Sequence, residues 1–105
     1  MPRTGTRTPS LPLQSENAWR DHTVIPYARL QGWRVYFTHH SQHSPAGFPD
    51  LWMTRGPRLL VRELKTDRGV VTEAQAAWLA ALQAAGVDAE VWRPSMWTEI
   101  QEELA

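Results

Sequence analysis

Two short runs of strand-forming residues, 50–55 and 58–65, lie on either side of Gly56-Pro57. A Gly-Pro pair between two such runs is typical of a tight turn, so we expect the runs to pair antiparallel. Symmetric pairing about the turn places Asp50 opposite Glu63. Directly opposed residues share a face of the sheet, with Cβ atoms ~5 Å apart. The sequence therefore predicts a β-hairpin that holds two carboxylates together.

The segment before this hairpin predicts a helix and a strand. Ser15 can cap a helix over residues 16–31 that ends at Gly32. Pro26 lies inside this helix and removes a backbone hydrogen bond, so we expect a kink or a break there. Residues 33–37 are rich in aromatic and β-branched side chains, which predicts a strand.

The segment after the hairpin predicts a helix, a strand and a last helix. Apolar residues recur at helical spacing over residues 72–85, and Gly86 follows where a helix often ends. Residues 87–91 alternate as in a half-buried strand, and Pro94 separates them from a final helix. The order αβββαβ with a C-terminal helix predicts an α/β sandwich. We expect the core-facing residues of the long helix to be Ala74, Ala77, Trp78, Ala81, Leu82 and Ala85.

Length and composition predict one domain that is held together by burial. The 105 residues leave room for one core, which we place over residues 15–105, after an N-terminal arm over 1–14 that we expect to be disordered. The chain has no cysteine, so neither disulfides nor a cysteine zinc site can stabilise it. No apolar run approaches the ~18 residues of a membrane span, and no secretory signal is visible. We therefore expect a soluble, cytoplasmic protein with no membrane partner.

The hairpin also carries the residues that predict chemistry. Glu63 and Lys65 are two positions apart and so project to the same side of their strand. Two carboxylates at cross-strand distance repel each other unless a cation such as Mg²⁺, which prefers oxygen ligands, lies between them. Lys65 is the only lysine among eleven basic residues, and its ammonium suits the stabilisation of charge on a phosphate.

Pro49-Asp50 followed by Glu63-Leu64-Lys65 resembles the motif of the PD-(D/E)xK nucleases, which have a restriction-endonuclease-like core. The segments GFPDL at 47–51 and RELKTDRG at 62–69, with Gln75, resemble more closely the virus-type replication-repair nuclease family, VRR-NUC. This resemblance implies that Asp50, Glu63 and the carbonyl of Leu64 bind Mg²⁺, for which Mn²⁺ can substitute. It also implies that Lys65 is catalytic, that Gln75 orients the lysine or a water, and, by position alone, that Glu16 is a further metal ligand.

Several of these residues have a second interpretation. Gln75 also completes a capping box that begins at Thr72, and Glu16 also suits the first turn of a helix. Arg62 and Arg68 flank the motif, where they either contact DNA phosphates or only solvate the strand end. The loop over residues 38–47 invites two interpretations, a zinc site and a loop that faces phosphate, and we favour the second. The loop residues concerned are His39, His40, His43 and Ser44, of which His43 and Ser44 are our candidate DNA contacts.

The function expected from this pattern is metal-dependent hydrolysis of DNA phosphodiester bonds. The resemblance implies an endonuclease for branched DNA such as four-way junctions, in a bacterial or phage-infected cell, working as a homodimer. Trp92, Met96 and Trp97 are candidates for the dimer interface unless the last helix packs them into its own core. Trp52 shares a face with Asp50 and is a candidate substrate contact. The alternatives are a DNA-binding module without catalysis and a protein that binds metal through its histidines.

Overall fold

The computed structural model describes residues 14–38 and 45–105 of the chain. Its elements follow the expected order, with a helical N-terminal segment, three strands, a long helix, a fourth strand and a last helix. They are α1 (Glu16–Trp19), a π-helical turn (Arg20–Val24), α2 (Ile25–Leu30), β1 (Arg34–Phe37), β2 (Leu51–Arg55), β3 (Arg58–Leu64), α3 (Glu73–Ala84), β4 (Asp88–Trp92), a 3₁₀ turn (Pro94–Met96) and α4 (Trp97–Leu104). The predicted disordered arm falls almost entirely on residues 1–13, which lie outside the described part.

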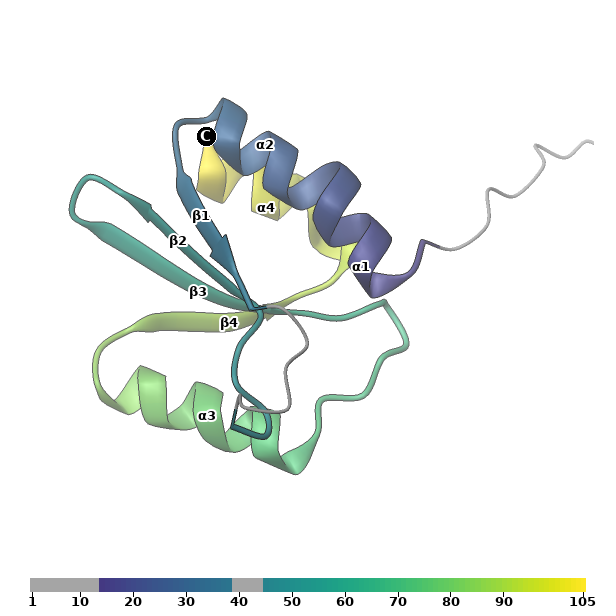
Figure 1. Ribbon diagram of the computed structural model, residues 1–105, viewed down its shortest axis with the longest axis vertical. Helices are drawn as coiled ribbons and strands as arrows, with labels where there is room; N and C mark the ends of the chain where they lie inside the picture. The colour runs from purple at the N-terminus through teal and green to yellow at the C-terminus, as the bar shows by residue number, and fades with distance from the viewer. Residues whose placement is uncertain (1–13, 39–44) are drawn as a thin grey trace, which may run out of the picture.

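The strands form one mixed sheet in the order β1-β2-β3-β4. β1, β2 and β3 are antiparallel neighbours, and β4 runs parallel to β3. The helices lie in two layers, with α1, α2 and α4 on one face of the sheet and α3 on the other (Figure 1). The hairpin register is the predicted one, from Arg55 opposite Arg58 to Leu51 opposite Arg62. The mixed α/β sandwich expected from the sequence is therefore confirmed.

The N-terminal helical segment is distorted next to Pro26, where we expected a kink or a break, but it stays helical. A π-helical turn precedes α2, and the N–H of Ile25 donates to the carbonyl of Arg20, five residues back. Pro26 then occupies the first turn of α2, where a missing N–H costs least. The extra residue in the π turn thus absorbs the proline, and Trp19 and Val24 both stay buried on either side of it.

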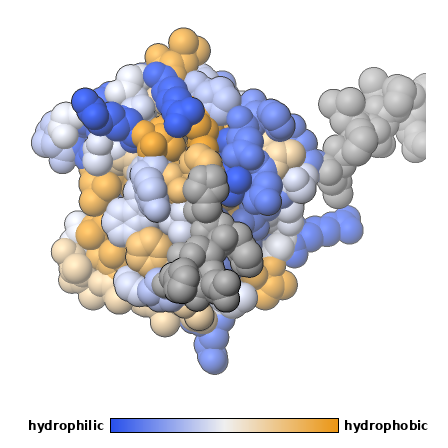
Figure 2. Space-filling view, viewed as in Figure 1, coloured by the Kyte–Doolittle hydropathy of each residue, from blue (hydrophilic) through white to orange (hydrophobic). Residues whose placement is uncertain are grey.

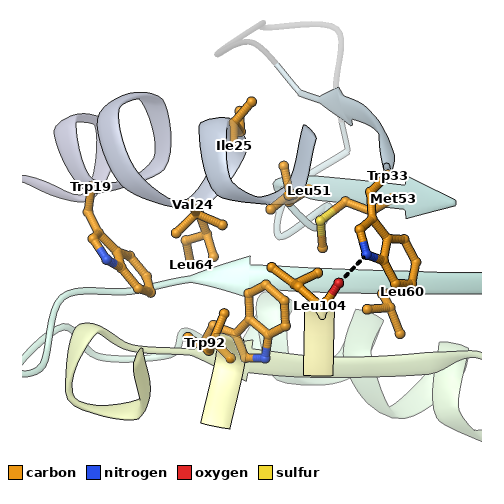
Figure 3. Close-up of a cluster of buried hydrophobic side chains, with 12 residues drawn as sticks. Trp19, Val24, Ile25, Trp33, Leu51, Met53, Leu60, Leu64, Trp92 and Leu104 are labelled. Atoms are coloured by element: carbon orange, nitrogen blue, oxygen red, sulfur yellow. Dashed lines mark hydrogen bonds between the residues drawn. The ribbon is translucent and has the colours of Figure 1, made fainter. Parts of the chain in front are cut away.

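Most of the core lies between the sheet and the layer of α1, α2 and α4 (Figure 3). Tryptophan and aliphatic side chains from both layers fill it. A hydrogen bond lies at the end of the core where α4 meets the start of β1. The indole N–H of Trp33 donates to the carbonyl of Leu104 at 2.9 Å, so the end of α4 is joined to the start of β1. The Arg55 guanidinium also donates to the Leu104 carbonyl, at 3.0 Å. These bonds satisfy a helix-end carbonyl that burial would otherwise leave unpaired.

A smaller core lies beneath α3, and it corrects the predicted face of that helix. Leu79 is buried against the sheet together with Val61 and Ala89. Leu82 packs against this cluster, as expected, and Trp78 and Ala74 are half-buried. The alanines that we expected to face the core, Ala77, Ala81 and Ala85, are exposed. The prediction was wrong here because alanines satisfy the helical spacing on either side, whereas the larger Leu79 buries more apolar area and decides the face.

The residues considered for a dimer interface lie in or against the main core. Trp92 is 1% exposed, and Met96 and Trp97 pack against the same cluster. The Trp97 ring meets the edge of Tyr27 with centroids 5.4 Å apart. Of the two possibilities that the sequence left open, packing into the core by the last helix is therefore confirmed, because α4 folds back over the sheet.

The surface seen in Figure 2 mixes hydrophobic and hydrophilic residues in small groups. Four large hydrophobic side chains of the described residues are exposed, and they come from different elements. They are Leu30, Tyr36, Leu59 and Val70. No helix within residues 14–38 or 45–105 has the length and apolar character needed to cross a membrane.

Arg62 is a structural residue, which corrects our expectation that it contacts phosphate. Its side chain is fully buried, and its guanidinium lies over the Trp92 ring at 4.9 Å from the centroid. It pairs with Asp88 at 3.0 Å and with Glu103 at 2.9 Å. Arg62 alternates with Glu63 along β3 and so points to the opposite face of the sheet. Its ion pairs join β3 to β4 and to α4 on the face of the sheet opposite Glu63.

Replacing Arg62 by alanine is expected to destabilise the protein by about 2–4 kcal/mol. The substitution removes the packing on Trp92 and leaves two half-exposed carboxylates without their partner, which costs less than the loss of a fully buried pair. Urea unfolding measures the change. Arg68→Ala is the matched control, because Arg68 is exposed in the same motif and its loss is expected to cost less than about 0.5 kcal/mol. Equal effects of the two substitutions would contradict the structural role.

Candidate active site

Three carboxylates from different elements meet at one end of the sheet. Glu16 lies in the first turn of α1, Asp50 directly before β2 and Glu63 near the end of β3. Each offers an oxygen, and these oxygens all lie within 4.8 Å of one another. Continuing the hairpin register by one pair brings Asp50 beside Glu63, as the sequence predicted. Glu16, which was predicted by position alone, lies with them although it is distant in the sequence.

Two local features orient Glu16 and Asp50. Ser15 caps α1, since its Oγ accepts the N–H of Ala18 at 3.0 Å, and this cap places Glu16 in the first turn. The Oδ2 of Asp50 accepts the backbone N–H of Leu64 at 3.1 Å, which ties the start of β2 to the end of β3. The helix-dipole interpretation of Glu16 and its place in the cluster are thus compatible.

Gly47 explains how the segment before Asp50 reaches this position. Its φ is +79°, and a Cβ on it would lie 2.4 Å from the carbonyl carbon of Ala74 and 2.6 Å from the backbone nitrogen of Gln75. A glycine is therefore required for the chain to lie against the first turn of α3. Phe48 then packs edge-on against Trp78, with centroids 5.2 Å apart. Sequence reasoning quoted Gly47 within the motif but missed this contact, since its partner is twenty-seven residues away along the chain.

Gln75 completes the predicted capping box and also contacts the carboxylate cluster, while its role toward the lysine or a water stays a prediction. Its backbone N–H donates to Thr72 Oγ1 at 3.1 Å, and its Oε1 accepts the N–H of Thr72 at 2.9 Å, which completes the capping box. Its Nε2 donates to Glu63 Oε2 at 2.9 Å. Because the cap occupies Oε1, the amide can present only its N–H₂ end to Glu63. The helix cap thus orients a hydrogen-bond donor toward the cluster.

Glu63 is the most perturbed group of the site. It is 2% exposed, and no donor among the described residues reaches its Oε1. Burial, and then the charge of Asp50 and a hydrogen bond with it, raises the pKa of Glu63 from 4.5 to about 8. Burial and the same neighbour also raise the pKa of Glu16. A buried oxygen without a donor among like charges suits a divalent cation, which would stabilise the ionised carboxylates.

Lys65 follows Glu63 by two residues and lies half-buried beside the cluster. Its positive charge acts to lower the pKa of both Glu16 and Glu63, although burial outweighs it. A tight turn comes next, closed by the Gly69 N–H on the Thr66 carbonyl at 3.1 Å. A Cβ on Gly69 would lie 3.3 Å from the Lys65 Cδ, so the turn packs against the lysine side chain.

Arg93 holds this turn in place and was missed by sequence reasoning. Its Nη1 donates to the carbonyl of Thr66 at 2.6 Å and to that of Gly69 at 2.8 Å. The N–H of Ser95 donates to Asp67 Oδ1 at 2.9 Å, which ties the turn to the start of the 3₁₀ segment. The sequence offered no signal for this contact beyond a basic residue after a strand. Arg68 lies in this turn and is exposed, and its contact with DNA stays a prediction.

The remaining predicted positions are Leu64, Trp52 and four residues of the segment after β1. The carbonyl of Leu64 lies at the end of β3, next to the carboxylates, and its role as a ligand stays a prediction. Trp52 is half-buried, stacked on Phe48 at 5.5 Å between centroids, so most of its surface contacts protein. The predictions for His39, His40, His43 and Ser44 fall on residues outside the described part of the chain.

Comparison with known proteins shows the family of this chain. Residues 9–96 match the VRR-NUC domain, and the matched region includes the three carboxylates, Lys65 and Gln75. The chain belongs to the VRR-NUC family. No curated protein and no solved structure matches it. The matched region ends at the 3₁₀ turn, so α4 lies outside it. Glu103 of α4 nevertheless pairs with Arg62 of the VRR-NUC motif.

The raised pKa of Glu63 predicts how the stability of the metal-free VRR-NUC domain depends on pH. Between its ordinary value of 4.5 and about 8, the folded protein holds a proton that the unfolded chain has released. The free energy of unfolding should therefore fall as pH rises through this window, by up to about 1.4 kcal/mol per pH unit. Urea unfolding in chelator across this range measures it. Glu63→Gln should flatten the dependence, and a slope identical to that of the unsubstituted protein would contradict the assignment.

The contact of Gly47 with α3 predicts an effect of Gly47→Ala on metal binding. The added Cβ would push the first turn of α3 away and displace Gln75 from Glu63. We expect Mn²⁺ affinity, measured by calorimetry, to fall about 10-fold or more, as for other losses of support around metal ligands. Gly56→Ala is the control, because Gly56 has a φ of +57° but nothing within 4 Å of an added Cβ. Similar Mn²⁺ affinities for the two variants would show that the strain of a positive φ, and not the contact with α3, sets the effect on metal binding.

Proposed function

We propose that this VRR-NUC domain is a metal-dependent DNA endonuclease with a PD-(D/E)xK core. The observation that carries the proposal is the convergence of three carboxylates, one of them with a buried oxygen that no donor of the described residues reaches. Lys65 and Gln75 lie beside this cluster, so a set of groups suited to phosphodiester hydrolysis is assembled from five positions of one chain. Membership of a nuclease family supports the same chemistry.

The metal would be Mg²⁺, with Mn²⁺ able to substitute. Glu16, Asp50 and Glu63 offer hard carboxylate oxygens, and the Leu64 carbonyl adjoins them, which is the donor type that these ions prefer. When bound, such an ion would neutralise the scissile phosphate and lower the pKa of a water molecule. The cap of α1 holds Glu16, and the register of β2 and β3 holds Asp50 beside Glu63, so burial of these elements fixes the ligands before a metal binds.

Lys65 and Gln75 would act on the groups around the reacting phosphate. The ammonium of Lys65 is a compact charge that can donate hydrogen bonds to a phosphate oxygen or to the attacking water. Gln75 holds one oxygen of Glu63 through Nε2, so the other oxygen, Oε1, is the one presented to the metal. Gln75 is a positioning residue in this scheme, because it acts through Glu63.

The substrate would be branched DNA such as a four-way junction, cut by a homodimer in a bacterial or phage-infected cell. Two cuts related by a two-fold axis require two sites, and the described residues of one chain form one carboxylate cluster of this kind. Light scattering with and without junction DNA measures the assembly. The alternative is a DNA-binding module without catalysis, and the complete set of carboxylates with Lys65 argues against it.

Asp50→Asn and Glu63→Gln are each expected to abolish cleavage. Labelled duplex, flap, single-stranded and four-way DNAs are incubated with Mg²⁺ or Mn²⁺, and products are resolved on denaturing gels. Each substitution removes one ligand charge and relieves repulsion in the metal-free site, so the fold should stay intact or gain stability. Glu99→Gln is the matched control, because Glu99 is exposed on α4. Metal-dependent cleavage that persists in either site variant would overturn the metal assignment.

A further inference from the structure

Among the described residues, α3 covers only part of the sheet face that carries the site. α3 packs over β3 and β4, where Leu79 contacts Val61 and Ala89. On the same face the β1 side is open, and Tyr36 is 62% exposed. Arg34 and Thr54 are exposed as well, and they form a cross-strand pair. Within the described residues, a strip of exposed side chains thus runs along β1 and β2 beside α3.

We propose that this strip, formed by Arg34, Tyr36 and Thr54, binds the DNA backbone that leads away from the cleaved phosphate. The inference rests on the proposed nuclease function and adds to it the path of the substrate. It concerns a nucleic-acid surface that is separate from the carboxylates, the lysine and the glutamine.

The register sets the spacing between the strip and the site. Tyr36 pairs with Trp52, and Arg34 pairs with Thr54, which are two and four residues after Asp50. At about 3.3 Å per residue, the two pairs lie about 7 Å and about 13 Å along the strands from the level of Asp50. A B-form strand advances 3.4 Å per nucleotide along its axis, so the strip covers roughly the four nucleotides next to the cut.

The charge distribution along β1 suits contact with a polyanion. No acidic residue occurs between Asp21 and Asp50 in the sequence, so β1 itself carries no negative charge. No carboxylate of the described residues pairs with Arg34, which leaves its guanidinium available to an anion. The acidic side chains of β4, Asp88 and Glu90, share the other face of the sheet with Arg62, which pairs with Asp88. A polyanion on the α3 side of the sheet is therefore attracted by the unpaired guanidinium of Arg34 on β1.

The side chains of the strip suit a backbone contact without base recognition. Arg34 can pair with a phosphate, and the Thr54 hydroxyl and the Tyr36 phenol can donate to phosphate oxygens. The exposed ring of Tyr36 can also stack on a base at a position where the strands separate. Such contacts carry no sequence information, which fits a nuclease that selects DNA by its shape.

The test compares DNA binding by variants that cannot cleave. Arg34→Ala and Tyr36→Ala are each made in Asp50→Asn protein, and binding to fluorescent duplex and four-way DNA is followed by anisotropy across a salt series. Arg29→Ala in the same background is the matched control, since Arg29 is exposed on α2 on the other side of the sheet. Leu30→Ala, which truncates a side chain that is 79% exposed, is the control for Tyr36.

We expect Arg34→Ala to lower the slope of log affinity against log salt by about one, and Tyr36→Ala to weaken binding about fivefold or more. The controls should leave both values unchanged, and thermal melts should be the same for all variants. If the unsubstituted protein cleaves DNA but the strip variants bind like their controls, this proposal is overturned and the nuclease function stands. If no DNA is cut by the unsubstituted protein and none is bound, both proposals fail.

Discussion

The antiparallel register of β2 and β3 is the constraint on which the rest of this structure depends. Pairing about Gly56 makes Leu51 face Arg62, and the next position on each strand is a carboxylate. Because side chains alternate along a strand, a slip of one residue would send Glu63 into the apolar core and Arg62 toward the cluster. Burial of Arg62 between β4 and α4 opposes such a slip, since its two carboxylate partners lie only on that face. A buried arginine within the motif thus secures the position of the acidic residue that follows it.

The carboxylates of the cluster repel one another, and the surrounding structure holds them together. Like charges within 4.8 Å and a raised pKa at Glu63 mean that the metal-free site retains a proton or is destabilised. The α1 cap, the Leu64 N–H and the Gln75 amide hold the carboxylates in place against this repulsion. Preorganisation of this kind is what a cation site requires, because the ligands need not be gathered when the ion binds.

The two layers of helices divide structural and functional tasks between them. The layer of α1, α2 and α4 encloses the larger core, and the first turn of α1 contributes Glu16 to the site. α3 covers less of its face but contributes Gln75 and the surface on which Gly47 rests. Among the described residues, the exposed side chains of Arg34, Tyr36 and Thr54 lie on the part of that face that α3 leaves uncovered. The arrangement gives a small domain one end for chemistry and one open face for a ligand.

The sequence by itself determined the order of the elements, the hairpin register, and the positions of Asp50, Glu63 and Lys65 on one face. These follow from local rules, since turn residues set the pairing and alternation sets the face. Only the tertiary structure decided that Glu16 joins the cluster and that Gln75 links its helix cap to Glu63. It also decided that Arg62 and Trp92 are buried, that Leu79 sets the face of α3, and that a π turn accommodates Pro26. These depend on contacts between residues distant in the chain, where packing and charge pairing select among local options that the sequence pattern leaves equal.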